Sequence, residues 1–161
     1  MRKVLFISLV LFGFLSSAYA QQSFGYLFQK GAIRDSIRFT NESNLIVIPI
    51  KINGKGPYKF ILDTGSESGM IFDESIIDTS YIAQNRVVPI YSGNGELVTE
   101  LLVALSLDIT FGGIRGKSQS MLVFQEYNLD IRNALGVDAR GILGSDVFNR
   151  FIVEVNYEEE L

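Results

Sequence analysis

The chain has 161 residues and a net charge of −4, and it contains no cysteine, histidine or tryptophan. The missing residue types exclude a cysteine nucleophile, a Ser-His-Asp triad, a zinc finger and a disulfide framework. Any catalysis by this chain must therefore use carboxylates, hydroxyls, lysines or backbone groups. The length suits one domain, and 47% apolar with 20% charged residues is a globular composition. The negative charge leaves no electrostatic footprint for nucleic acid.

The first twenty residues have the three-part pattern of a secretory signal peptide. Two basic residues precede an apolar run over residues 4–15, and small residues lead up to Ala20. The apolar run is shorter than the ~20 residues that a helix needs to cross a bilayer. We therefore expect cleavage near Ala20, export to the periplasm or out of the cell, and no stable membrane anchor afterwards. Residues 21–36 would then be a lead-in and residues 37–161 a single domain.

Short strands and turns alternate along the rest of the chain. Residues 36–40 are expected to be an entry strand. Residues 45–62 read as a β-hairpin, because Asn, Gly and Pro at residues 53–57 supply turn chemistry between two apolar runs. Ser145 could cap a short helix, with Asp146 in its first turn. We expect further strands at 69–72, 87–91, 97–111, 118–124 and 152–157, and helical turns at 75–79 and 145–151. This order of elements predicts an all-β fold.

Several partial motifs fail on their own chemistry. Asp63 and Glu74 stand at the ends of a calcium-loop spacing, but Gly65 is not a ligand and Ser68 replaces the glycine that such a loop requires. The Gly-x-Gly pairs lack the rest of a phosphate-binding pattern, and residues 141–145 lack the serine of a nucleophile elbow. Residues 41–43, which begin with Asn41, match the short acceptor pattern for N-glycosylation, and a three-residue match of this kind is weak evidence. We predict no metal and no cofactor.

One stretch carries chemistry. Residues 60–62 are an apolar strand that runs directly into Asp63, Thr64, Gly65 and Ser66. A late apolar-apolar-Gly segment follows at Ile142, Leu143 and Gly144, after Gly141. A hairpin lies just upstream of Asp63 and a Gly-containing turn at residues 92–95 lies between the two motifs.

Together these features resemble one lobe of a retropepsin-like aspartic peptidase, and they are close to secreted bacterial aspartyl proteases with a DTGS and a GILG motif. The resemblance covers about residues 37–157. It implies a closed, barrel-like sheet with a flap hairpin and one short C-terminal helix. Asp63 would be the catalytic carboxylate, with Thr64 and Gly65 completing the catalytic loop and residues 142–144 supporting it. A polypeptide would be the substrate.

The neighbours of Asp63 can be given roles from their chemistry. Thr64 can bond to the matching loop of a second lobe, and Gly65 lets two loops approach while its amide faces the carboxylate. Ser66 can donate to the outer oxygen of Asp63. The flap implied by the resemblance is the turn of Ser92, Gly93, Asn94 and Gly95. Tyr91 stands one position away from the aromatic position of the pepsin branch, so it is left out of the catalytic set.

The chain supplies only one aspartate of the required pair. Asp78 begins the nearest echo of the motif, Asp-Thr-Ser, which lacks the glycine. The second carboxylate must come from an identical chain or from a second lobe, and relatives often continue into a second lobe or a PDZ domain. Two alternatives stay open: a catalytically silent binding or dimerisation module, and a strand-ending turn in a secreted β-sandwich.

Overall fold

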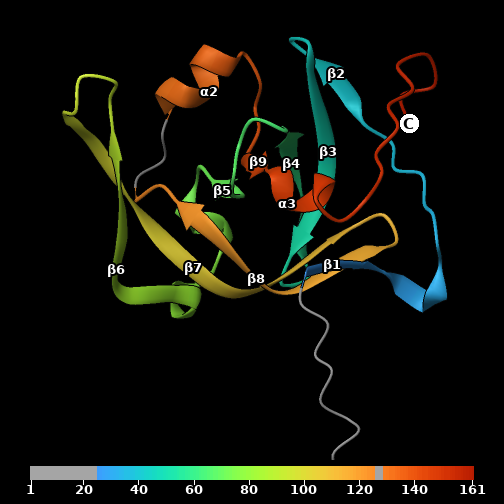
Figure 1. Cartoon of the computed structure of the whole chain (residues 1–161), viewed down its shortest axis with the longest axis horizontal. Helices are drawn as coiled ribbons and strands as arrows, with labels where there is room; N and C mark the ends of the chain where they lie inside the picture. The colour runs from blue at the N-terminus through green and yellow to red at the C-terminus, as the bar shows by residue number, and fades with distance from the viewer. Residues whose placement is uncertain (1–24, 126–128) are drawn as a thin grey trace, which may run out of the picture.

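The computed structural model describes residues 25–125 and 129–161 (Figure 1). β-Strands are the predominant regular structure of this part, and the helical elements are short. The strands are β1 (Gly25–Phe28), β2 (Thr40–Glu42), β3 (Leu45–Ile52), β4 (Lys55–Leu62), β5 (Met70–Ile71), β6 (Ile82–Tyr91), β7 (Leu97–Phe111), β8 (Ile114–Val123) and β9 (Gly141–Leu143). The 3-10 helices are η2 (Gln29–Gly31), η3 (Glu74–Ile76) and η4 (Thr79–Tyr81), and the α-helices are α2 (Leu129–Leu135) and α3 (Ser145–Phe148).

Six strands close on themselves into a barrel. The pairing runs β8-β5-β9-β4-β3-β7, and β7 pairs again with β8 to complete the ring. β1 extends the sheet beyond β8, β2 pairs with β3, and β6 lies outside the ring against β7. The all-β fold with a closed, barrel-like sheet that the sequence predicts is therefore confirmed.

The barrel encloses the hydrophobic core. Its fully buried side chains come mostly from strands that are far apart in the sequence, so the burial of apolar surface holds the ring together. The largest of them are Phe60, Phe72, Ile50, Ile52, Ile71, Leu101, Leu107, Ile109, Leu143 and Val123. In the described part of the chain no helix is long and apolar enough to cross a membrane.

The β3–β4 hairpin has a tighter turn than the sequence predicts. Ile52 pairs with Lys55, so Asn53 and Gly54 alone form the turn. Both have positive φ angles, 51° and 77°, as a two-residue type I′ turn requires. Lys55, which we expected in the turn, already belongs to β4.

Other boundaries differ because pairing partners, not local patterns, fix strand ends. β6 begins at Ile82 and β8 at Ile114, earlier than expected, since β7 is long enough to pair with both. The entry strand forms at Thr40–Glu42 against β3 and not at residues 36–39. β1 and α2 were not predicted.

The C-terminal prediction is wrong in two respects. Residues 152–157 form no strand, because no other strand of the described chain pairs with them; instead Asn156 and Leu161 exchange backbone hydrogen bonds across a terminal turn. α3 ends at Phe148, and its N-cap is Gly144 with no side-chain capping bond, so Ser145 is the first helical residue and not the cap. Asp146 does lie in the first turn.

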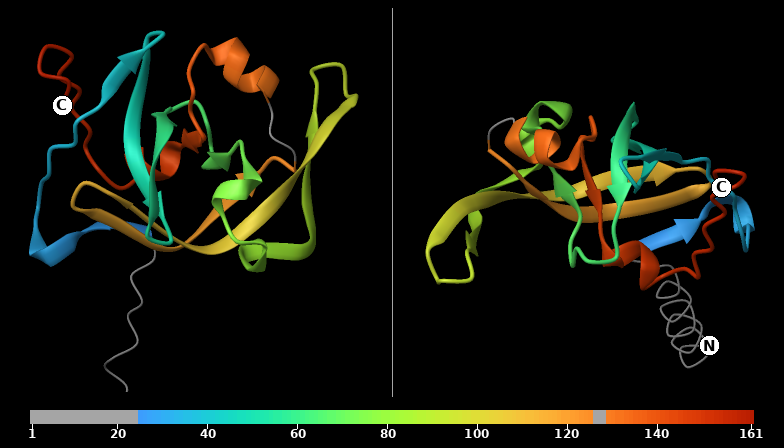
Figure 2. Two further views of the ribbon diagram at one scale, coloured as in Figure 1. Left: turned by 180° about the vertical axis from the view of Figure 1, so that it is seen from behind. Right: turned by 90° about the horizontal axis from the view of Figure 1, so that it is seen from above.

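The β6–β7 hairpin leaves the barrel and projects from it, as both views of Figure 2 show. β6 is an edge strand. The far half of the hairpin exposes apolar side chains, among them Ile90 and Tyr91 of β6 and Leu97 and Val98 of β7. A register shift between Ile82 and Val87 separates the projecting half from the part next to the barrel.

Candidate active site

β9 lies between the two strands that flank the Asp63 loop. It pairs in parallel with β4, with Ile142 opposite Ile61 and Leu143 opposite Leu62, and antiparallel with β5, with Ile142 opposite Met70. The chain therefore leaves β4, makes the loop of residues 63–69 around the end of β9, and returns as β5. The late apolar-apolar-Gly segment and the Asp-Thr-Gly motif, distant in the sequence, meet at this point.

Two glycines make this close packing possible. A Cβ atom on Gly144 would lie 2.5 Å from the Ser66 carbonyl oxygen and 3.0 Å from the Ser68 backbone. A Cβ atom on Gly141 would overlap the Met70 carbonyl oxygen and the Phe60 ring. Side chains at either position would therefore push β9 away from the loop or from β4 and β5.

Asp63 stands at the tip of the loop and is fixed through its backbone. Its N–H donates to the Leu143 carbonyl oxygen at 3.0 Å. Its Oδ1 accepts the Gly65 N–H at 2.8 Å. The Asp63 side chain is half-buried, whereas Thr64 and Gly65 are exposed. The carboxylate is thus oriented by one backbone donor and still open on one side.

Ser66 does not act on Asp63 in this chain. Its hydroxyl donates to the Ser68 carbonyl oxygen at 2.7 Å, within the loop, and the residue is buried. Its own carbonyl oxygen accepts the Ser145 N–H at 2.7 Å. Ser66 therefore connects the loop to the start of α3, and the hydrogen bond to the outer oxygen of Asp63 that we expected is replaced by these contacts.

The predicted flap turn is the tip of the projecting hairpin. Ser92 N–H donates to the Glu96 carbonyl oxygen and Gly95 N–H to the Ser92 carbonyl oxygen, both at 2.9 Å. The Asn94 side chain accepts from the Ser92 hydroxyl and from the Glu96 N–H. The tip is thus held by its own side chains, while Gly93 has no neighbour within 4 Å of its Cβ position.

The sequence analysis missed the ion pair between Asp73 and Arg140, which holds the start of β9 in place. Asp73 follows β5 and pairs with Arg140, the residue before β9. The Arg140 backbone also bonds to both neighbours of β9: its N–H donates to Lys59 and its carbonyl oxygen accepts from Phe72. Asp73 is the N-cap of η3, where it accepts from the N–H and the hydroxyl of Ser75. The sequence did contain a signal for this cap, because an aspartate two residues before a serine, as in Asp73 and Ser75, is typical of the start of a helical turn.

We expect Asp73→Ala to lower the free energy of unfolding by about 3 kcal/mol, because it removes both a buried carboxylate that pairs with Arg140 and the N-cap of η3. Burial alone raises the pKa of Asp73, but the hydrogen bonds from Ser75 and the Arg140 charge outweigh it and lower that pKa. The stabilisation is then complete above the unfolded aspartate pKa of about 3.9 and is lost as pH falls through the lower folded pKa. Denaturant unfolding of both proteins at several pH values measures it.

The exposed Lys59–Glu42 ion pair provides the matched control. Glu42→Gln is expected to cost less than about 1 kcal/mol, because exposed pairs contribute little. The role given to the Asp73–Arg140 pair is wrong if Asp73→Ala lowers the free energy of unfolding no more than Glu42→Gln does. It is also wrong if the effect of Asp73→Ala is unchanged when the pH falls below the pKa of Asp73.

Within residues 25–125 and 129–161, no group of three or more acidic side chains is placed to hold a metal ion. Asp78 lies on a different element from Asp63: it caps η4 and accepts the Ser80 N–H at 2.9 Å. The structure thus brings together Asp63, Thr64, Gly65, Ser66, Ile142, Leu143 and Gly144, and it places Ser92, Gly93, Asn94 and Gly95 at the hairpin tip.

Comparison with known proteins agrees with this geometry. A model of the aspartyl protease family matches residues 48–147, so the chain belongs to that family. Among the solved structures that match is a retropepsin-like aspartic protease from Rickettsia conorii, with a TM-score of 0.51 and 18% sequence identity. The alignment covers 78% of this chain and 86% of that one, and it establishes the retropepsin-like fold of a single lobe. A search of curated protein sequences finds no relative.

Proposed function

We propose that this protein is an exported aspartic endopeptidase in which Asp63 is one of two catalytic carboxylates. The observation that carries the proposal is the position of Asp63, at a loop tip fixed by β9 and with its carboxylate oriented by the Gly65 N–H. Membership of the aspartyl protease family supports it. The pattern of the first twenty residues supports export.

The second carboxylate would come from an identical chain across a two-fold axis, or from a second lobe. Thr64 and Gly65 are exposed beside Asp63. Among the described residues, none is shown to form a hydrogen bond with the Thr64 side chain. A Cβ atom on residue 65 would lie 3.3 Å from Asp63 Oδ1, so the glycine leaves the carboxylate open to a matching loop. A two-fold axis next to this loop would bring two copies of Asp63 together.

The paired carboxylates would perform general acid–base catalysis. Two carboxylates a few ångströms apart do not both ionise, so they share one proton. The ionised member takes a proton from a water molecule as that water attacks the scissile carbonyl carbon. The protonated member donates to the carbonyl oxygen. An extended peptide would lie between the Asp63 loop and the β6–β7 hairpin, which would close over it.

A second candidate is a catalytically silent binding or dimerisation module. The specific observation that favours it is that the sequence contains a single Asp-Thr-Gly motif. A lobe with this fold can keep its packing without any chemistry, since fold and function are separable.

Sedimentation at micromolar concentration, combined with a peptide-cleavage assay in the acid range, separates these candidates. We expect a concentration-dependent dimer whose specific activity rises with the dimer fraction. A protein that stays monomeric over the whole range and cleaves nothing would favour the silent module. A monomer with full activity would contradict the pairing of two chains.

A further inference from the structure

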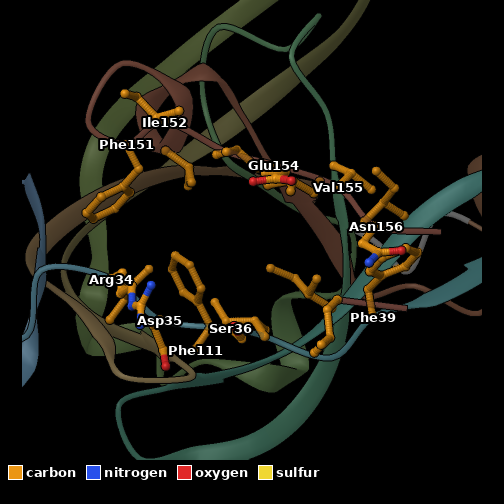
Figure 3. A pocket seen from close by; sticks show the side chains of 18 of the residues that line it. Arg34, Asp35, Ser36, Phe39, Phe111, Phe151, Ile152, Glu154, Val155 and Asn156 are labelled. Carbon is orange, nitrogen blue, oxygen red and sulfur yellow. The ribbon is translucent and has the colours of Figure 1, made fainter. Parts of the chain in front are cut away.

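The described part of the chain contains a cavity that does not include Asp63. Its volume is about 460 Å³, within the range of ligand-binding pockets. One wall is the segment of residues 34–39, the opposite wall is the segment of residues 151–156, and Figure 3 shows the hollow between them. The floor is apolar and comes from the barrel and α3, with Ile48, Leu62, Phe111, Ile114 and Val147. We call this cavity the tail groove.

Both walls of the tail groove have backbone groups without backbone partners. Residues 34–38 and 152–155 belong to no helix or strand. Within the described chain, none of their N–H or carbonyl groups takes part in a backbone–backbone hydrogen bond. Polar backbone groups next to an apolar floor are strongly favoured to find partners. An extended polypeptide between the walls can supply donors and acceptors to both sides at once, as an added β-strand does.

The side chains of the tail groove define the sequence that fits. Successive side chains of a strand point to opposite faces, so one set would meet the apolar floor and the other would point out towards the rim. Four exposed charged residues line the groove and form its rim: the carboxylates of Asp35, Glu154 and Glu159 and the guanidinium of Arg34. Asp35 already accepts the Gly113 N–H at 2.6 Å, which leaves Glu154 and Glu159 as the carboxylates available to a ligand. An excess of negative charge at the rim favours basic side chains at the outward positions.

We propose that the tail groove is a docking site for an extended segment of a partner polypeptide with alternating apolar and basic residues. The site is separate from the proposed catalytic loop. This chain carries a net charge of −4, so a second copy would meet the acidic rim with a like charge. The occupant is therefore a basic partner polypeptide and not a second copy of this chain.

The probe for the test is a blocked seven-residue peptide in which valine and lysine alternate. Binding is measured with Asp63→Asn protein, so that the probe is not cleaved. A peptide of the same composition with all valines grouped together is the matched control, since it cannot place one face on the floor. A third peptide carries N-methyl groups on its backbone and keeps the side chains.

We expect the alternating peptide to bind at least about tenfold more tightly than either control, because the controls lose the apolar face or several main-chain hydrogen bonds. Backbone amide signals of residues 34–39 and 152–156 should shift. Glu154→Gln combined with Glu159→Gln should weaken binding at low salt, and the difference should disappear at about 1 M salt, where charges are screened.

Four results would each overturn the proposal: no binding at about 1 mM peptide, equal binding of the N-methylated peptide, amide shifts confined to residues 63–69 and 91–97, or dissociation of a dimer by the peptide. The third result would assign the peptide to the catalytic cleft. The fourth would make the tail groove an interface between copies. Neither depends on whether the protein cleaves peptides, so this test and that of the proposed function fail independently.

Discussion

Asp63→Asn is expected to lower kcat/KM for peptide cleavage by about 10²–10⁴-fold in the acid range. An asparagine keeps the shape of the side chain and can still accept the Gly65 N–H, but it cannot take a proton from water or share one with a second carboxylate. The effect is therefore on the chemical step. Rates of cleavage of a fluorogenic peptide library, measured for both proteins at equal concentration, provide the test.

Asp78→Asn is the matched control for this substitution. Asp78 also begins an Asp-Thr-x sequence and also accepts an N–H two residues on, from Ser80. The sequence after Asp78 lacks the glycine of the motif. Asp78 caps η4 and is not supported by β9. We expect Asp78→Asn to leave cleavage unchanged, and both variants to unfold within a few degrees of the parent protein.

Equal activity of Asp63→Asn and the parent would refute the catalytic assignment, whatever the fold. A loss of activity in both variants, together with a lower melting temperature in both, would show that unfolding and not chemistry was measured. Sedimentation of Asp63→Asn completes the comparison, because the variant should keep the association state of the parent if Asp63 acts only in the reaction.

The local patterns of the sequence were sufficient for the strands whose partners are their neighbours. The β3–β4 hairpin and β7 follow directly from runs of β-branched and apolar residues between turn residues. The support of the Asp63 loop by residues 142–144 was implied by the resemblance to the peptidase family, which depends in part on the late apolar-apolar-Gly segment that follows Gly141. In the structure, both glycines face backbone atoms that leave no room for a Cβ.

The errors lie where long-range contacts decide the structure. Residues 152–157 alternate like a strand, yet a strand needs a partner, and the described chain offers none at that place. β1 was missed because a strand of four residues is too short to show a clear alternation of apolar and polar residues. Its pairing with β8 is what makes it a strand. The role of Arg140 could not be foreseen, since it depends on Asp73 lying beside the start of β9.

Ser66 shows the limit of assigning roles within a motif. Its hydroxyl was expected to donate to Asp63, but the loop turns back on itself and the hydroxyl donates to the carbonyl oxygen of Ser68 instead. The geometry of the loop is determined by its contact with β9 and α3, which the motif alone does not describe. The same contact makes Gly144 sensitive to substitution, because a Cβ atom there would meet the backbone of the Asp63 loop.

Gly144→Ala is expected to lower the free energy of unfolding by about 3 kcal/mol, as overpacking against rigid neighbours does. The added methyl would lie 2.5 Å from the Ser66 carbonyl oxygen and 3.0 Å from the Ser68 backbone, and none of these atoms belongs to a flexible side-chain end. Relief requires the loop of residues 63–69 to move away from β9. The melting temperature should fall by roughly 10 °C.

Gly93→Ala is the control, because nothing lies within 4 Å of that Cβ position and its φ angle is not in the left-handed region. It is expected to change the free energy of unfolding by less than about 0.5 kcal/mol. Gly144→Ala should also shift the amide signals of Asp63 and Gly65, because the loop carries the carboxylate with it, and cleavage should fall further than the folded fraction does. A variant as stable as Gly93→Ala, with unshifted loop signals, would mean that β9 does not support the Asp63 loop, and the physical basis for placing the catalytic carboxylate there would be lost.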